Sequence, residues 1–526
     1  MWTTVDVCEC ARSAMAMIEG YTGSTSVAQG SSIDFYINNI PDPGSPPYFT
    51  IEVFRAVAGR PSVHKGVGIA HAQVYPVLAY RFGCRWPQAY SLPIANDAQE
   101  WPSGVYDAVF TNENNAATTI RFIVKPKSRS APILMVWPVT TYLAYYYDES
   151  RKPYDRSLYD SYEAARARIV SFDRPISWAD HGELSFWRWL DTNGYMIDAC
   201  TSVDVHRHPS LLSGYRLLLS VGHDEYWSKE MRDHVEDFVA RGGNAAFFSA
   251  NTCWWQVRFE NGDRTMVCHK SAVDDPMTGK DDDRVTVNWS SAPVNRPENW
   301  LTGVGFRNGG GGWDTAWPAY QYRVRDAKNW VFAGTGLRDG DQFGRGVIGY
   351  ETDAVLFRET ATGPKATGHD GSPLDLNILA TADLGEWRYS GQGGFATMAF
   401  FSRGGSVFTA GVVDWAGGLD DPIIERITRN VIDRLSSALR PEVRTETTDE
   451  TRSVERPRDR IKGDTPLSRG ALTADTPFEE SIGTSLDLDL RPQSALRWPD
   501  YEWGANRRHP VNRHDDWVCR ALIICS

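Results

Sequence analysis

Residues 215–251 read YRLLLSVGHDEYWSKEMRDHVEDFVARGGNAAFFSAN, and this stretch decides the fold of the 526-residue chain. It begins and ends with short apolar runs, which are typical of strands buried on both faces of a sheet. Between these runs Met231, Val235 and Phe238 recur at the spacing of one helix face, and Gly242 follows where the helix should end. A strand, a helix and a second strand in this order predict an α/β domain with a doubly wound sheet.

Similar signals on both sides extend this α/β domain to residues 128–440. The run APILMVWPV, residues 131–139, predicts another buried strand. Helices are expected over residues 182–195 and 420–439, where apolar positions again repeat with helical spacing.

The pattern between about residues 280 and 410 is mixed. We predict short strands among long loops, and residues 286–289 and 330–336 are two of these strands. The sequence NGGGGWD, residues 308–314, predicts a flexible loop because it consists mainly of glycine.

Two further regions flank the α/β domain. Residues 1–127 hold short β-rich segments that are separated by Gly, Pro and Asn clusters such as NNIPDPGSPP. This spacing predicts a β-sandwich of the immunoglobulin-like kind. Residues 441–526 are polar and of mixed charge, which predicts a partly disordered tail. The end of the tail regains aromatic side chains, and we expect it to dock onto the protein.

Composition excludes several classes of protein. Lys and Arg number 55 against 67 Asp and Glu, a formal net charge of −12, whereas a general nucleic-acid binder needs a basic face. The chain has no apolar run of about 18 residues that predicts a membrane span, and we recognise no signal peptide. Eight Cys without disulfide or zinc spacing predict reduced thiols in a cytoplasmic protein. The aromatic content of 12% suggests pockets lined by rings.

Ionisable side chains gather directly after the first strand of the opening stretch. The segment SVGHDEYWS, residues 220–228, contains His223, Asp224, Glu225 and Tyr226. Sites in open α/β sheets form at the carboxyl ends of strands. Burying such groups is costly unless they are paired or bound to a metal, so the segment indicates a catalytic or metal site. The alternative is a helix N-terminal turn whose acidic residues complement the helix dipole.

Three other segments contain candidate site residues. TTYLAYYYDESRKPYDRSLYD, residues 140–160, carries six Tyr; a phenolate oxygen suits ferric iron, and the alternative is a packed aromatic loop. Asn251 ends the second strand of the opening stretch, where its amide could stabilise an oxyanion or cap a turn. Glu351, in VIGYETD, is a carboxyl group in an apolar strand and therefore a candidate base.

Five motifs, SFDRPISW, WRWLDTNGY, GHDEYW, GGNAAFFSANTCWW and VFTAGVVDWA, follow one another along the chain. Together they resemble the large (β) subunit of N,N-dimethylformamidase and its relatives. The resemblance implies a β-sandwich-like domain followed by an α/β domain similar to the class I glutamine amidotransferases. It places GHDEYW where the amidotransferases keep their nucleophile, although no Cys occupies that position here.

The resemblance also implies a mononuclear, non-haem Fe(III) held by two Tyr and one Glu, and hydrolysis of the C–N bond of a small amide. Carried over to this sequence, the metal ligands are Tyr106, Tyr145 and Glu225, and the catalytic residues are His223, Asn251 and Glu351. Fe(III) would act as a Lewis acid and lower the pKa of a bound water. His223 or Glu351 would move the proton, and Asn251 would hold the substrate or the tetrahedral intermediate.

The chain departs from the family at one important segment. The usual AYN-x-GG-SLY reads AYYYDESRKPYDRSLY here, so its glycines are missing and Tyr142, Tyr146 and Tyr147 compete with Tyr145. The family works with a small helical subunit, so we expect a possible partner of that kind, a homo-oligomer, and no nucleic acid or membrane. Two other functions stay open. One is a metalloenzyme of another class, such as an oxidative tailoring enzyme of secondary metabolism, and the other is a carbohydrate- or peptide-binding protein with a vestigial site.

Overall fold

The computed structural model describes residues 16–151, 155–159, 166–312, 320–384 and 394–437. The predicted tail, residues 441–526, and the expected docking of its end lie outside these ranges. Among the described residues, every helix is too short or too polar to cross a lipid bilayer.

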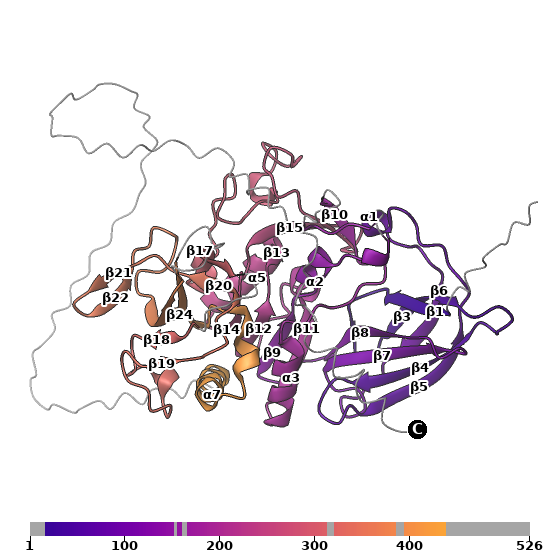
Figure 1. Ribbon diagram of the computed structural model, residues 1–526, viewed down its shortest axis with the longest axis horizontal. Helices are drawn as coiled ribbons and strands as arrows, with labels where there is room; N and C mark the ends of the chain where they lie inside the picture. Colours follow the sequence, from indigo (N-terminus) through magenta and orange to yellow (C-terminus); the bar gives the residue numbers. More distant parts are fainter. Residues whose placement is uncertain (1–15, 152–154, 160–165, 313–319, 385–393, 438–526) are drawn as a thin grey trace, which may run out of the picture. The chain divides into compact units, whose positions relative to one another are not determined.

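The N-terminal region forms two sheets that share one apolar core (Figure 1). The first sheet has the order β1 (Met17–Thr22), β3 (Ser32–Ile40), β6 (Gln88–Pro93). The second has the order β2 (Ser26–Ala28), β8 (Ala117–Lys125), β7 (Gly104–Asn112), β4 (Tyr48–Arg55), β5 (Ser62–Ile69), and a short helix α1 (Ala79–Phe82) precedes β6. Phe35 of β3 packs between Phe110 of β7 and Phe122 of β8, at ring-centroid distances of 5.1 and 5.9 Å. Apolar side chains that alternate along the strands therefore face one another between the sheets.

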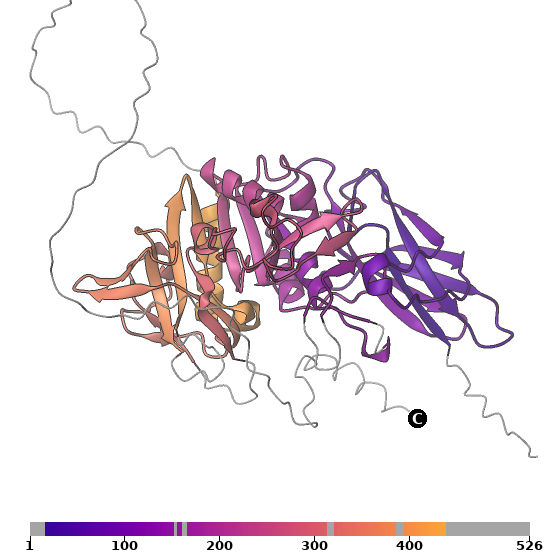
Figure 2. The same cartoon turned by 90° about the horizontal axis from the view of Figure 1, so that it is seen from above.

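A nine-stranded sheet forms the centre of the α/β region, and Figure 2 shows it beside the N-terminal sheets. Five strands run parallel in the order β11 (Ile197–Thr201), β9 (Ile133–Trp137), β12 (Leu217–His223), β14 (Asn244–Ala250), β25 (Gly405–Thr409). Four strands continue the sheet with antiparallel pairing, namely β24 (Phe395–Arg403), β23 (Asn377–Asp383), β18 (Tyr322–Val324) and β19 (Gln342–Phe343). The direction changes at a tight hairpin between β24 and β25, where Gly404 has a φ of 81°. The sheet is therefore parallel in one half only.

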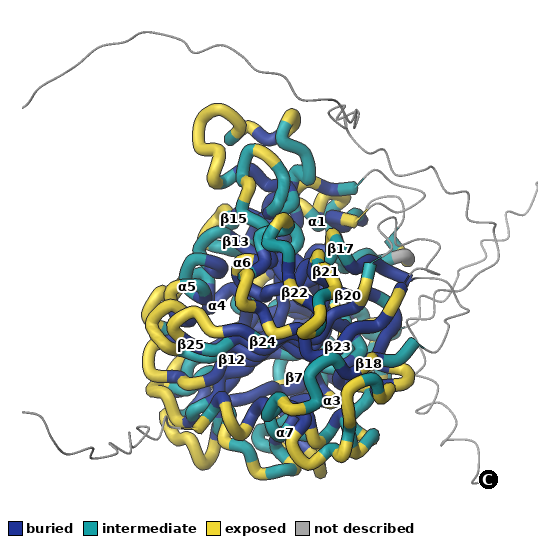
Figure 3. Tube along the Cα trace, turned by 90° about the vertical axis from the view of Figure 1, so that its left-hand side faces the viewer, coloured by how far each residue is buried: buried dark blue, intermediate teal, exposed yellow. Residues whose placement is uncertain are grey.

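Both faces of the large sheet are covered, as the buried interior in Figure 3 shows. Ile133 and Met135 of β9 pack on one side with helices α3 (Glu183–Thr192) and α7 (Pro422–Ser436). Leu134 and Val136 pack on the other side with α5 (Lys229–Ala240). The remaining helices are α2 (Val139–Tyr145), α4 (Ser202–Arg207) and α6 (Asn299–Thr302), with 3-10 turns η1 (Glu149–Arg151), η2 (Asp282–Arg284), η3 (Trp330–Phe332) and η4 (Val413–Gly418).

Three small sheets complete the described fold and correct parts of the sequence prediction. They contain β10 (Ile169–Ser171), β16 (Thr265–Val267), β15 (Trp255–Glu260) and β13 (Tyr226–Ser228), then β17 (Gly305–Gly312) with β20 (Tyr350–Ala354), and β21 (Phe357–Thr360) with β22 (Gly363–Ala366). The expected flexible loop is strand β17 as far as Gly312. Its glycines permit close approach to β20, because a Cβ on Gly309 would lie 2.0 Å from the carbonyl oxygen of Thr352.

Two predicted strands are absent from the described residues at their expected places. Residues 330–336 begin with the turn η3, because the side chain of Asn329 accepts the N–H of Val331 at 3.2 Å and caps it. Within residues 286–289 only Asn288 makes a β-bridge, to Trp255. Short apolar segments of this kind do not distinguish a strand from a turn.

Candidate functional site

Two neighbouring strands and β20 bring four polar side chains together. β12 ends at His223 and its parallel neighbour β14 ends at Ala250, so Asn251 follows at the same edge of the sheet. Nε2 of His223 lies 2.8 Å from Oε2 of Glu351 in β20 and 3.5 Å from Oε2 of Glu225. Nδ2 of Asn251 donates to Oε2 of Glu351 at 3.2 Å and lies 3.5 Å from Nε2 of His223. All four side chains are buried.

Tyr145 adds a phenol to these side chains. It is the last residue of α2, and its hydroxyl donates to Oε2 of Glu225 at 2.6 Å. Thr141, one turn earlier in α2, accepts the backbone N–H of Glu225 at 3.0 Å, so the helix holds both the backbone and the side chain of Glu225. The ring of Tyr145 lies 5.4 Å from the ring of His223, between centroids. We call these five residues the polar cluster: Tyr145, His223, Glu225, Asn251 and Glu351.

Two tyrosines that compete with Tyr145 in the sequence pack elsewhere. Tyr142 is buried in the core, where its ring lies 5.7 Å from the ring of Trp178. Tyr146 lies under the guanidinium of Arg174, at 4.9 Å from its ring centroid. Tyr145 is therefore the one of these three that contacts Glu225.

The structure does not bring Tyr106 to the polar cluster, which corrects its assignment as a metal ligand. Tyr106 is fully buried in the sandwich core, with its ring 5.2 Å from that of Trp101 and 5.7 Å from that of Phe122. Its hydroxyl donates to the carbonyl oxygen of Pro102 at 2.7 Å. The pleat of β7 explains the position of Tyr106. Val105 faces the core of the α/β region, so the side chain of Tyr106, the next residue, faces the opposite way, into the sandwich core.

The members of the polar cluster shift one another's proton affinities. Burial acts to lower the pKa of His223, but Glu351, together with Glu225 and Asp224, raises this pKa to about 9. Burial acts to raise the pKa of Glu351, but His223, together with Asn251 and His181, lowers it below its usual value. Burial raises the pKa of Glu225, although His223 opposes the shift. The arrangement favours an imidazolium beside a carboxylate, a pair that can pass a proton.

His181 and Tyr350 lie against the polar cluster and were not predicted from the sequence. The ring of His181 is 5.3 Å from that of His223 and stacks on Tyr350 at 5.5 Å. Burial, helped by the nearby His223, lowers the pKa of His181 to about 4, so its imidazole is neutral at pH 7. Neither residue could have been identified from the sequence. His181 lies in a loop, Tyr350 precedes the candidate Glu351, and neither belongs to a periodic pattern.

Gly222 allows the segment that carries His181 to reach the end of β12. Its φ is 76°, and a Cβ at this position would lie 2.7 Å from Oε1 of Glu183 and 3.1 Å from the carbonyl oxygen of His181. Glu183 is fully buried, and its Oε2 accepts the N–H of His181 at 2.5 Å. The position of His181 opposite His223 therefore depends on glycine at residue 222.

Lys270 and Asp414 are two more charged residues beside the polar cluster that sequence reasoning missed. Nζ of Lys270 donates to the hydroxyl of Tyr226 at 2.7 Å, and its charge acts to lower the pKa of Glu225. Burial raises the pKa of Asp414 to about 6, and Glu351 adds to this shift. Asp414 lies in the motif VFTAGVVDWA, which could have drawn attention to it.

Comparison with known proteins identifies a family that covers most of the chain. A family model described as "N,N-dimethylformamidase beta subunit-like, C-terminal" matches residues 55–430, which include the whole polar cluster. The chain belongs to this N,N-dimethylformamidase β-subunit-like family.

Two curated relatives are N,N-dimethylformamidase beta subunits, from Alcaligenes sp and Paracoccus aminophilus. They are 22% identical over 432 residues and 24% identical over 331 residues. The matches cover 67% and 53% of this chain but 54% and 42% of the relatives, so the chain spans about half the length of the curated relatives it matches. Among solved structures, the mmIFT52 N-terminal domain matches 48% of this chain and 90% of its own, at 10% identity. Its TM-score of 0.28 is too low to support an argument.

A metal ion at this dimethylformamidase-like cluster would depend on oxygen donors. Counting only His, Cys, Asp and Glu, the described residues contain no group of three or more that could hold a metal ion. The phenol of Tyr145 adds a hard donor at 2.6 Å from the carboxylate of Glu225, and such donors suit a trivalent cation. Two further phenols lie near the cluster. The ring of Tyr226 contacts the ring of Tyr145, and the ring of Tyr350 contacts the ring of His223.

A buried ion pair holds the tyrosine-rich segment of this dimethylformamidase-like site in place. The side chains of Arg174 and Asp155 are fully buried and paired, and Arg174 also donates to the carbonyl oxygen of Tyr146 at 3.3 Å. We expect Asp155→Ala to lower the free energy of unfolding by about 3–5 kcal/mol, because it leaves a buried charge unpaired. Urea unfolding measures this. The control Asp191→Ala breaks a partly exposed pair with Arg55 and should cost less than about 1 kcal/mol; equal losses would contradict the prediction.

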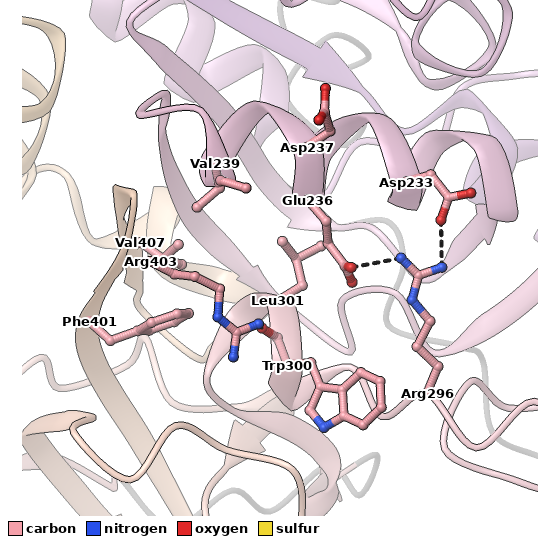
Figure 4. A pocket seen from close by; sticks show the side chains of 11 residues that line it. Asp233, Glu236, Asp237, Val239, Arg296, Trp300, Leu301, Phe401, Arg403 and Val407 are labelled. Carbon is pink, nitrogen blue, oxygen red and sulfur yellow. Dashed lines mark hydrogen bonds and ion pairs between the residues drawn. The ribbon is translucent and has the colours of Figure 1, made fainter. Parts of the chain in front are cut away.

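A separate hollow of about 330 Å³ lies near the opposite end of the parallel strands (Figure 4). Val407, which lines the hollow, pairs with Ala245, the second residue of β14. The polar cluster instead lies at the other end of β14, where Asn251 follows its last residue. Arg296 bridges Asp233 and Glu236 on α5 at 2.6 and 2.7 Å, so these charges are satisfied within the hollow's wall. The hollow is therefore distinct from the polar cluster, which is the candidate active site of this dimethylformamidase-like chain.

Proposed function

We propose that this chain is an iron-dependent amidohydrolase that cleaves the C–N bond of a small amide. The observation that carries the proposal is the polar cluster, in which a phenol, two carboxylates, an imidazole and an amide meet at the carboxyl ends of strands. The family supports it, since the curated relatives are named as dimethylformamidase subunits. Function is argued from this site and not from the fold, because one fold hosts many reactions.

Tyr145 and Glu225 are the residues that would hold the iron. Their oxygens lie 2.6 Å apart, and both are hard donors of the kind that would hold a trivalent cation. Tyr106 cannot supply the second phenol, and Tyr226 and Tyr350 are the phenols beside the cluster. When bound, Fe(III) supplies Lewis-acid chemistry, which polarises a carbonyl and acidifies water.

The side chains of the cluster have separate tasks in this proposal. Glu351 accepts a proton from the attacking water, and His223, held 2.8 Å away, delivers a proton to the leaving amine. Nδ2 of Asn251 donates to the oxygen on which negative charge develops. His181 and Tyr350 pack against the imidazole of His223 and fix its plane. The four members of the cluster other than Tyr145 are buried, and exclusion of bulk water strengthens each of these interactions.

The direct test combines metal analysis with a panel of small amides, including dimethylformamide. We expect the purified protein to contain close to one iron per chain and to release amine from at least one amide. Removal of iron by a chelator should abolish both amine release and visible absorption, and Fe(III) should restore both. A folded protein that stays colourless and inactive after iron is added would refute the proposal.

A further inference from the structure

The backbone of Asn251 adopts an uncommon conformation. It directly follows β14, and its φ is 49°, in the left-handed region that residues with a Cβ seldom adopt. This turn redirects the chain so that the side-chain amide reaches Glu351 at 3.2 Å and approaches His223 at 3.5 Å. If the turn relaxed, the amide would leave the polar cluster. The position of this amide therefore depends on the contacts that the backbone of Asn251 makes.

The carboxylate of Asp353 holds this turn. The N–H of Asn251 donates to its Oδ1 at 2.8 Å, and the N–H of Thr252 donates to its Oδ2 at 3.5 Å. Two successive N–H groups that bind the two oxygens of one carboxyl group fix the backbone turn from which they point. Asp353 is itself anchored, because its own N–H donates to the carbonyl oxygen of Gly411 at 3.0 Å.

An ion pair does not account for the burial of the Asp353 side chain. Its side chain is fully buried, and among the described residues no Lys, Arg or His lies within ion-pair distance of it. The charged side chains whose fields act on it are Glu298 and Glu351, which are both acidic. Burial, to which these two acidic neighbours add, raises the pKa of Asp353 to about 8. A buried carboxyl group is costly unless its oxygens are hydrogen-bonded, and here they accept the two backbone N–H groups.

The strand β20 links this carboxylate to the proposed chemistry. Glu351 and Asp353 are two residues apart on β20, so their side chains leave the strand on the same face. Glu351 accepts from the side chain of Asn251, and Asp353 accepts from its backbone. One strand therefore fixes both ends of Asn251.

We propose that Asp353 is a positioning residue, which holds the Asn251 turn so that its amide can stabilise the reaction's developing negative charge. The inference rests on the proposed function, since it deepens the role of Asn251. Asp353 does not touch the reacting atoms and acts through Asn251 alone.

A double-mutant cycle on amide hydrolysis tests the coupling. We expect Asn251→Ala to lower kcat by about 10²–10³-fold, the cost of one oxyanion donor. Asp353→Ala should lower kcat by about 10–100-fold with little change in KM, while Asp353→Asn recovers most of the loss because its oxygen can still accept one N–H. In the Asn251→Ala background, Asp353→Ala should have no further effect. Effects that multiply in the double variant would overturn the proposal.

Asp198 offers a matched control at the other end of the sheet. Its carboxylate is also fully buried and also accepts two successive backbone N–H groups, from Ser130 and Ala131 at 2.9 and 3.2 Å. It lies near the start of β11, away from the polar cluster. Asp198→Ala should therefore reduce stability as Asp353→Ala does, without lowering kcat.

Hydrogen exchange separates failure of this inference from failure of the proposed function. In Asp353→Ala, the amides of Asn251 and Thr252 should exchange at least about tenfold faster than in the wild type, and in Asp198→Ala they should not. Unchanged exchange in Asp353→Ala would overturn the positioning role, whether or not the protein hydrolyses amides. A wild-type protein without amide hydrolysis would refute only the proposed function, and the exchange result would still decide whether Asp353 fixes the turn.

Discussion

A Tyr145→Phe variant should lose the visible absorption of a tyrosinate–iron centre, and its affinity for iron should fall by at least about 100-fold. The substitution removes one oxygen, which lies 2.6 Å from the carboxylate of Glu225. It keeps the ring, whose contacts with His223 and Tyr226 preserve the packing around the site. Absorption spectra and iron analysis after titration with Fe(III) measure the effect, and amide hydrolysis should fall with the iron content.

The control for this experiment is Tyr106→Phe, which makes the same chemical change in the sandwich. It removes the hydrogen bond to Pro102 and should cost about 1 kcal/mol of stability. The colour and the iron content should stay those of the wild type. A variant of Tyr106 that loses its iron, beside a variant of Tyr145 that keeps it, would show that the polar cluster is not the metal site.

Glu351→Gln should lower kcat by about 10²–10⁴-fold, the range for loss of a general base, with little change in iron content. Gln keeps the volume of the side chain but cannot take up a proton from water. His223 also loses the carboxylate that raises its pKa, so it is less protonated at neutral pH. Steady-state kinetics on the best amide of the panel measures kcat and KM separately.

Glu298→Gln is the matched control, because Glu298 is another buried carboxyl group. Glu298 is 1% exposed against 4% for Glu351, and neither of its side-chain oxygens has a hydrogen-bond partner among the described residues. Neutralising it should leave kcat within about threefold of the wild type, since it does not touch the polar cluster. Equal losses of kcat in the two variants would contradict a specific role for Glu351.

The strand–helix–strand core could be predicted because its signals are local. The apolar runs became β12 and β14, and the helical spacing from Met231 to Phe238 became α5. The antiparallel half of the sheet was not predicted, since a short apolar run does not show the direction in which its strand pairs. The glycine run of β17 was mistaken for a loop because its partner β20 cannot be identified from the run itself.

The candidate site was predictable to the extent that it lies in continuous motifs at strand ends. His223 ends one buried strand, Glu225 follows it, and Asn251 follows the next, and the structure brings the three together. Tyr106 was assigned from spacing along the chain, which does not show the face of a strand on which a side chain lies. His181 reaches the site through tertiary packing alone, and no local pattern encodes such a contact.

The glycine at residue 222 has a consequence for attempts to broaden the substrate range by directed evolution. Any side chain there would meet Glu183 at 2.7 Å and would have to adopt a φ of 76°, so selection should return only glycine at this codon. Trp254 beside the cluster is partly exposed and has no such constraint. Libraries should therefore diversify residues such as Trp254 and keep glycine at residue 222. Sequencing of active clones will show whether residue 254 varies while residue 222 stays glycine.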